Sequence, residues 1–130
     1  MTGLAYADAS ALVKLVIREA ESLALHRWYV EAERVVTSRI GVIETYRASS
    51  RHPHDPDHRD HVIDDLEVIE LNRSIAERAA AVLPPSIRTL DAIHLATAIH
   101  LLPDLEAFVT YDDRLAAAAR AFGLPVVRPA

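Results

Sequence analysis

The sequence predicts an α/β fold in which a parallel sheet is covered by helices on both faces. Two observations carry this prediction: short apolar runs alternate with longer helical patterns, and no internal repeat or linker divides the chain. The chain has 130 residues, of which 51% are hydrophobic and 25% charged, so it can form a compact core. We therefore expect a single domain spanning residues 1–130.

Five segments have the character of buried strands, because each is an apolar or β-branched run too short for a helix. The first run ends at Asp8, and the fourth is followed closely by Asp112 and Asp113. The expected strands are residues 4–7, 35–37, 67–71, 107–110 and 126–127.

Helices are expected between and after these strands, where apolar residues recur at helical spacing. Ser38 is a candidate N-cap, as is Asn72 or Ser74, and the prolines at positions 84 and 85 and Gly123 are helix stops. The expected helices are residues 10–18, 21–33, 38–50, 57–66, 72–83, 89–102 and 114–122.

Composition excludes several classes of function. The absence of cysteine rules out disulfides and thiolate metal sites. A net charge of −5 argues against a passive nucleic-acid binder, but not against a nuclease whose acidic centre binds cations. No apolar run approaches the ~20 residues that span a bilayer, and the first four residues lack a signal-peptide pattern, so we expect a cytoplasmic protein without a membrane association.

Four acidic residues occur where this fold can bring them together. Asp8 and Asp112 follow two different strands, so they reach the same rim if those strands are neighbours. Glu44 and Asp91 lie within helices on faces that also carry apolar residues, where a carboxylate needs a partner. Clustered carboxylates need a cation, and Mg²⁺ or Mn²⁺ would activate water for phosphodiester hydrolysis there.

Each of these acids also has an ordinary structural interpretation. Asp8 and Asp112 are N-cap candidates, although one residue can both cap a helix and bind a metal. Asp91 suits the first turn of a helix, and Glu44 is placed to form a salt bridge with Arg47 three residues later. Their possible convergence on one rim is more specific than any single position.

Four segments, in order and spacing, resemble the motifs of VapC-like PIN domains, the toxin ribonucleases of bacterial toxin–antitoxin pairs. The third segment is the most distinctive, and the four together extend over essentially the whole chain. They are residues 7–15 (ADASALVKL), 38–44 (SRIGVIE), 88–98 (RTLDAIHLATA) and 108–115 (FVTYDDRL).

The resemblance implies a three-layer α/β/α sandwich with a five-stranded parallel sheet of order 3-2-1-4-5. It implies Mg²⁺- or Mn²⁺-dependent cleavage of RNA, a homodimer, and inhibition by a small antitoxin whose C-terminal tail occupies the active-site groove. Matched residue by residue, the catalytic and metal-binding acids are Asp8, Glu44, Asp91 and Asp112. The supporting residues are Ser10 and Thr110, which match hydroxyl positions, and Asp113, which is placed to share or replace the role of Asp112.

Other chemistry-bearing residues receive more ordinary interpretations. A zinc site at His52, His54, His58 and His61 is disfavoured, because Pro56 is expected to interrupt helix formation and no cysteine is available. His94 is expected to pack or hydrogen-bond rather than act as a general base. Trp28 and Tyr29 are expected in the core or a dimer contact. Phosphate-contact candidates are Lys14, Arg39, Arg88 and Arg114.

Two other functions compete with a ribonuclease. The acidic net charge is compatible with a non-catalytic module that uses the same fold to bind RNA or protein. A phosphoryl-transfer receiver domain is disfavoured, because it would need an aspartate pair at the first strand and a lysine after the last, whereas Lys14 is the only lysine.

Overall fold

A computed structural model describes residues 3–130 as five parallel strands enclosed by helices. Met1 and Thr2 lie outside the described residues. They belong to the N-terminal segment in which we expected no signal peptide. The strand order is β3-β2-β1-β4-β5, as predicted, and β1 pairs directly with β4. The strands are β1 (Leu4–Ala7), β2 (Arg34–Ser38), β3 (Glu67–Ile69), β4 (Leu105–Val109) and β5 (Val126–Val127).

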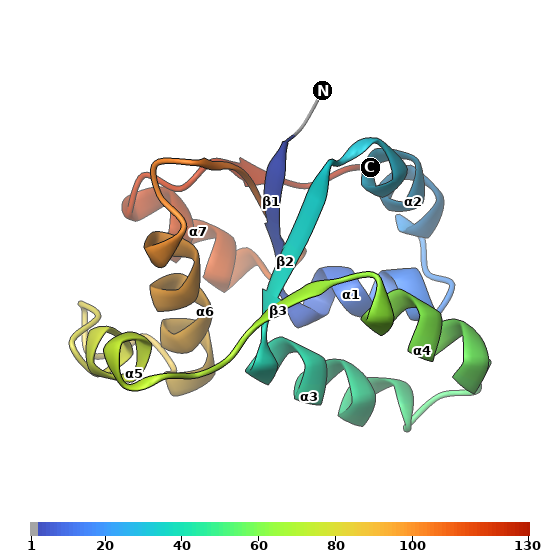
Figure 1. The fold of residues 1–130 in the computed structure, drawn as a ribbon, viewed down its shortest axis with the longest axis horizontal. Coiled ribbons are helices and arrows are strands. Elements are labelled where there is room, and N and C mark those ends of the chain that lie inside the picture. The colour runs from blue at the N-terminus through green and yellow to red at the C-terminus, as the bar shows by residue number, and fades with distance from the viewer. Residues whose placement is uncertain (1–2) are drawn as a thin grey trace.

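Two layers of helices cover the sheet and complete the predicted three-layer sandwich (Figure 1). One layer contains α5, α6 and α7, and the other contains α1 to α4. Within residues 3–130, none of the helices is both long and apolar enough to cross a membrane. The helices are α1 (Ala9–Val16), α2 (Ser22–Glu31), α3 (Arg39–Ser49), α4 (Pro56–Asp64), α5 (Arg73–Ala80), α6 (Thr89–His100) and α7 (Asp113–Ala121).

The alternation of side chains along β1 explains why two helical layers are needed. Ala5 and Ala7 pack into a core shared with α1 and α3, whereas Leu4 and Tyr6 pack into a second core shared with α6 and α7. Because a parallel strand is buried on both faces, each face requires its own apolar cover. The small side chains of Ala5 and Ala7 face α1, which lies directly after β1 in the chain.

The structure shifts most of the expected boundaries by one to three residues, and four elements illustrate the corrections. Pro56 does not interrupt a helix but begins α4, after Asp55 as its N-cap, since the first helical position needs no backbone N–H donor. The strand β4 begins at Leu105 and ends before Thr110, whose hydroxyl contacts the end of β1 instead. The third strand is shorter than expected, and α5 ends at Ala80, three residues before the expected position.

Candidate active site

The carboxylate of Asp8 is fixed at the end of β1 by three hydrogen bonds. Its Oδ1 accepts from the hydroxyl of Ser10 at 2.6 Å and from the backbone N–H of Ala11 at 3.1 Å, so Asp8 caps α1. Its Oδ2 accepts from the hydroxyl of Thr110 at 2.6 Å. Asp8 is only 3% exposed, and this burial raises its pKa, whereas the hydrogen bonds and the nearby His94 oppose that rise.

The same two hydroxyls connect Asp8 to the segment that carries Asp112. Thr110 Oγ1 accepts the backbone N–H of Asp112 at 3.1 Å, and Ser10 Oγ accepts the backbone N–H of Tyr111 at 2.8 Å. Asp112 Oδ1 accepts the backbone N–H of Leu115 at 2.9 Å and thereby caps α7. The rim formed by β1 and β4 is therefore held together by side-chain to backbone hydrogen bonds.

Asp91 faces this rim from the first turn of α6. Its pKa is raised, chiefly by burial and next by the negative charge of Asp112, with a smaller contribution from Asp8. His94 and Arg88 act in the opposite direction. Asp112 and Asp8 come from two other elements, so the fold brings both negative charges near enough to raise the pKa of Asp91.

Glu44 reaches the site from α3, and its partner is His94 of α6. His94 Nε2 lies 2.6 Å from Glu44 Oε1, and the Glu44 side chain is 29% exposed. The alternative salt bridge between Glu44 and Arg47 is not formed among the described residues. His94 thus makes hydrogen bonds as its sequence context predicted, and it links α6 to the acid on α3.

The donor chemistry of this site fits a divalent cation, but the side chains as placed do not form a closed cage. In residues 3–130, no three Asp, Glu or His side chains are arranged to hold a metal ion together. Asp8, Asp112 and Glu44 each have a carboxylate oxygen engaged by another part of the chain. Mg²⁺ usually binds through one or two carboxylates and keeps several waters, so it does not need such a cage. Its charge would offset the burial and the negative neighbours that raise the pKa values of Asp8 and Asp91.

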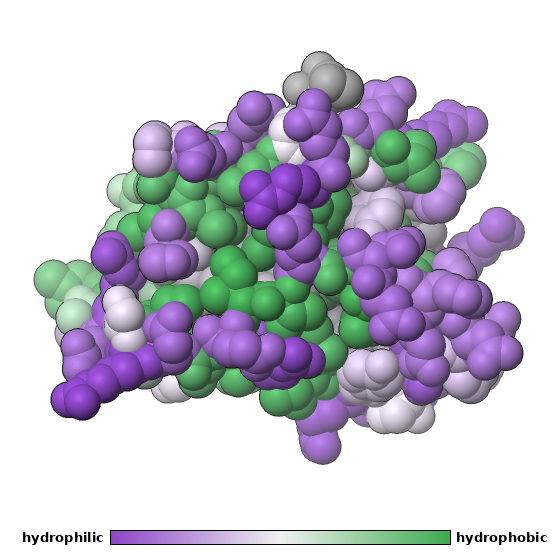
Figure 2. Space-filling view, viewed as in Figure 1, coloured by the Kyte–Doolittle hydropathy of each residue, from purple (hydrophilic) through white to green (hydrophobic). Residues whose placement is uncertain are grey.

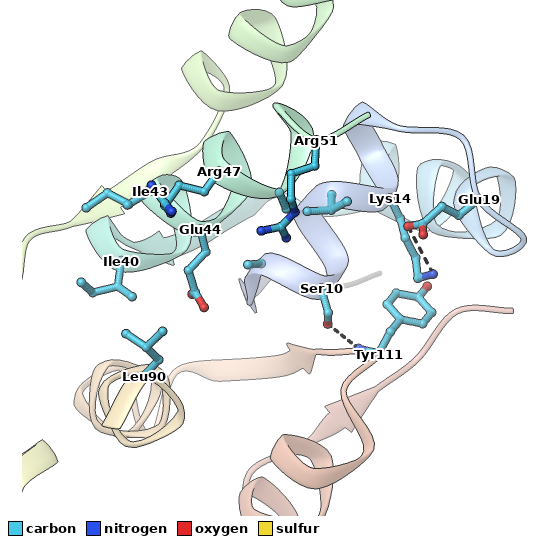
Figure 3. Close-up of a pocket in the computed structure, with 13 residues that line it drawn as sticks. Ser10, Lys14, Glu19, Ile40, Ile43, Glu44, Arg47, Arg51, Leu90 and Tyr111 are labelled. Atoms are coloured by element: carbon cyan, nitrogen blue, oxygen red, sulfur yellow. Dashed lines mark hydrogen bonds and ion pairs between the residues drawn. The ribbon is translucent and has the colours of Figure 1, made fainter. Parts of the chain in front are cut away.

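A groove of about 610 Å³ lies next to this rim (Figure 3). Of the four acids, Glu44 lines the groove, whereas Asp8, Asp91 and Asp112 do not. Ser10 and Tyr111 lie on one side, opposite Glu44 on α3 and Arg51 just after it. Arg47 also lines the groove. The other lining residues include apolar side chains, namely Val13, Ile40, Ile43, Ala48 and Leu90.

Arg47 and Arg51 are absent from the set of phosphate-contact candidates predicted from sequence. The sequence could have identified them as candidates, because Arg47 and Arg51 lie three and seven residues after Glu44 and so fall on the same helical face. Two predicted candidates are already engaged: Arg39 donates to Glu70 at 2.5 Å, and Lys14 contacts Glu21 at 2.6 Å. The other candidates, Arg88 and Arg114, do not line this groove.

Asp113 and the histidine cluster lie outside this arrangement. The Asp113 side chain is 90% exposed, and its carboxylate accepts from Arg128 at 2.6 Å. His58 Nε2 lies 2.8 Å from the carbonyl oxygen of Leu15, and His54 Nδ1 lies 2.9 Å from that of His52. In the described part of the chain, the cluster does not form a metal site. Trp28 and Tyr29 are partly buried against the core on the α1 side of the sheet.

The fold and the rim together define a class: a five-stranded parallel α/β/α domain with acidic residues gathered where β1 and β4 end. The sequence model of the family described as "PIN domain" matches residues 5–121. The chain belongs to the PIN domain family. Whether the remaining residues form part of the same domain stays a prediction.

Named relatives agree with this assignment. The chain is 35% identical over 130 residues to "Ribonuclease VapC47" of Mycobacterium tuberculosis, covering 95% of this chain and 96% of the relative. The fold is similar to that of VapC20 of Mycobacterium tuberculosis, described as a "Sarcin-Ricin loop cleaving toxin", with a TM-score of 0.73 at 18% identity and coverage of 96% and 99%. It is also similar to that of VapBC2 from Rickettsia felis, solved with a promoter DNA fragment, with a TM-score of 0.61 at 13% identity and coverage of 96% and 98%.

Proposed function

We propose that this chain is a Mg²⁺- or Mn²⁺-dependent endoribonuclease that acts as the toxin of a toxin–antitoxin pair. The observation that carries the proposal is the rim at which the hydroxyl of Thr110 joins Asp8 to the backbone of Asp112, and at which the charges of both acids raise the pKa of Asp91. Glu44 lines the neighbouring groove. The relative named as a ribonuclease at 35% identity over nearly the whole chain supports the same activity.

In this proposal the four acids bind the cation and the attacking water, and the neighbouring groove binds RNA. Asp8, Glu44, Asp91 and Asp112 would supply the carboxylate oxygens, while the hydroxyls of Ser10 and Thr110 hold Asp8 in its orientation. A bound divalent cation would lower the pKa of a water and stabilise the charge that develops on the phosphate. Arg47 and Arg51 are placed to contact the RNA backbone beside the reacting phosphodiester.

The decisive experiment compares the purified chain with its Asp91→Asn variant on a labelled RNA. Cleavage is expected with Mn²⁺ or Mg²⁺, and it should stop when a chelator is added. The Asp91→Asn variant should lose both cleavage and a Mn²⁺ binding isotherm measured by calorimetry. Equal cleavage by the wild type and the variant would indicate a contaminating nuclease and overturn the proposal.

The alternative is a non-catalytic PIN module that binds RNA or protein. One observation favours it: within residues 3–130, the acids as placed do not form a three-ligand metal set. It predicts that RNA binds in the groove with no Mn²⁺ isotherm and no cleavage under any metal condition. The same calorimetric titration therefore separates the two functions.

We further propose an antitoxin and a second copy of this chain as partners. The similarity to VapBC2, and to a relative named VapC47, supports the antitoxin as a partner.

Exposed apolar side chains around a hollow of about 380 Å³, including Leu83 at 67% exposure and Leu102, support the dimer. Figure 2 shows apolar side chains beside the position of α6 and toward the middle of this face, whereas mainly hydrophilic side chains cover α5. Light scattering would test for the dimer. A cytoplasmic location stays a prediction from the sequence.

A further inference from the structure

A buried histidine and a buried tyrosine form a chain of short hydrogen bonds behind Glu44. His94 Nε2 lies 2.6 Å from Glu44 Oε1, and His94 Nδ1 lies 2.5 Å from the Tyr6 hydroxyl. The His94 side chain is 3% exposed, and Tyr6 is fully buried. One imidazole therefore joins three elements, namely β1, α3 and α6.

The chemistry of Glu44 determines the direction of its hydrogen bond to His94. An ionised carboxylate can only accept, so His94 donates from Nε2 to Glu44. The Tyr6 hydroxyl can pair with Nδ1 in either direction, since it donates to a neutral imidazole and accepts from a protonated one. In both forms Tyr6 occupies Nδ1 and leaves the N–H of Nε2 for Glu44.

Packing leaves His94 little freedom to turn away from Glu44. The Tyr6 ring stacks on Phe108, with centroids 5.3 Å apart, and meets the edge of His94 at 73°. Gly41 lies one helical turn before Glu44, and a Cβ at this position would lie 3.3 Å from His94 Cε1 and 2.4 Å from Thr37 Oγ1. The glycine therefore lets α3 lie against Thr37 of β2, and it leaves room for the His94 ring beside α3.

From this geometry we infer that His94 is a positioning residue that holds the Glu44 carboxylate for the divalent cation, with Tyr6 orienting its ring. The inference rests on the proposed metal-dependent function. Its competitor is a purely structural role, in which the hydrogen bonds only join α3, α6 and β1. Residues that hydrogen-bond to a metal ligand and fix its orientation typically contribute about 10–100-fold to metal affinity or activity.

A pair of substitutions separates these roles, because asparagine and glutamine place an amide N–H at different distances from the backbone. In His94→Gln the amide reaches the position of Nε2 and can still donate to Glu44. In His94→Asn it reaches only the position of Nδ1, so the donor to Glu44 is lost. Thr97→Val is the matched control, since Thr97 is buried one turn later on α6 and its hydroxyl donates only to the carbonyl oxygen of Ile93.

Mn²⁺ binding to the full chain, measured by calorimetry without RNA, is the primary measurement. His94→Asn is expected to weaken Mn²⁺ binding about 10–100-fold and to shift the Mn²⁺ dependence of RNA cleavage to higher concentration, with kcat recovering at saturating Mn²⁺. His94→Gln and Thr97→Val are expected to stay within about threefold of the wild type, well inside that range. In a Glu44→Gln background, His94→Asn should have no further effect on Mn²⁺ binding, because the group that it positions is already changed.

Wild-type Mn²⁺ affinity in a folded His94→Asn variant would overturn the positioning role while leaving the proposed function intact. If His94→Asn weakened Mn²⁺ binding further in the Glu44→Gln background, the positioning role would also be overturned. If His94→Asn does not fold by circular dichroism, Tyr6→Phe decides, since it removes only the hydroxyl and is expected to weaken Mn²⁺ binding severalfold. A wild-type chain that binds no Mn²⁺ and cleaves no RNA would refute the proposed function, and the inference with it.

Discussion

The strand side of the site, where β1 and β4 end, and its α3 side, which lines the groove, differ in how firmly their polar groups are held. On the strand side, Asp8 is buried and receives three hydrogen bonds, and Asp112 caps α7. On the α3 side, Arg47 and Arg51 are exposed, and no ion pair engages either of them in the described part of the chain. Glu44 stands between these extremes, with one oxygen bound to His94.

This difference matches the two tasks of a nuclease. Chemistry at a phosphodiester requires donors held at fixed positions, which buried and hydrogen-bonded carboxylates provide. Binding a flexible single strand instead favours charged groups that can move to meet successive phosphates. We therefore expect substitutions on the strand side to affect turnover, and those on the α3 side to affect RNA affinity.

The largest effect is expected from Asp8→Asn. Cleavage should fall more than about 100-fold, beyond the range typical of partners that only orient a metal ligand. The melting temperature in metal-free buffer should change little, because two effects oppose each other. Burial raises the pKa of Asp8 and makes its ionised form costly in the folded chain, whereas the amide nitrogen of asparagine cannot accept the hydrogen bond from Thr110. Asparagine removes that charge and keeps an oxygen to cap α1.

Cleavage assays with and without Mn²⁺, together with thermal unfolding in the presence of a chelator, test both parts of this prediction. A melting temperature that drops by many degrees would mean that the charge of Asp8 supports the fold. In that case the contrast between the two sides would concern stability rather than function.

An intermediate effect is expected from Arg47→Gln and Arg51→Gln. Each should weaken RNA binding severalfold with little change in kcat, and each should reduce the slope of log K against log salt by about 0.7, the value for one phosphate contact on a single strand. Arg73→Gln is the matched control, because Arg73 pairs with Glu77 on α5 and does not line the groove. An unchanged salt dependence of RNA binding in both variants would show that the RNA backbone does not contact the α3 side of the groove.

The smallest effect is expected from Asp113→Asn. Its exposed ion pair with Arg128 contributes at most about 1 kcal/mol, and its neighbour Asp112 occupies the capping position. Cleavage should change less than twofold, whereas Asp112→Asn should behave like Asp8→Asn. A large loss in Asp113→Asn would reassign the fourth acid and move the active site toward the C-terminal segment that carries Arg128.

The two helix caps on the strand side could be predicted from sequence because they are local interactions, unlike the hydrogen bonds that Ser10 and Thr110 make across the rim. Asp8 caps the helix that follows it, and Asp112 does the same, so both positions can be inferred from strand ends and capping preferences. The order of the strands came from the resemblance to a known family, and the pairing of β1 with β4 confirms it.

The α3 side could not be predicted in the same way. The partner of Glu44 proved to be His94, which is 50 residues away, rather than Arg47 in the next turn. Such a contact depends on how closely two helices pack, and here Gly41 leaves room for the His94 ring beside α3. The prediction that Pro56 interrupts a helix was wrong because it treated Pro56 as an interior residue, whereas Pro56 is the first residue of α4.

Asp8 and Asp112 each start a helix, and this gives the fold an unusual tolerance to inactivation. Serine, threonine or asparagine at either position would begin the same helix without supplying an ionised group. We expect a copy of this domain with one such change to keep its fold but to lose the proposed cleavage of RNA. Similarity of fold to this chain therefore does not by itself show that a protein is an active nuclease.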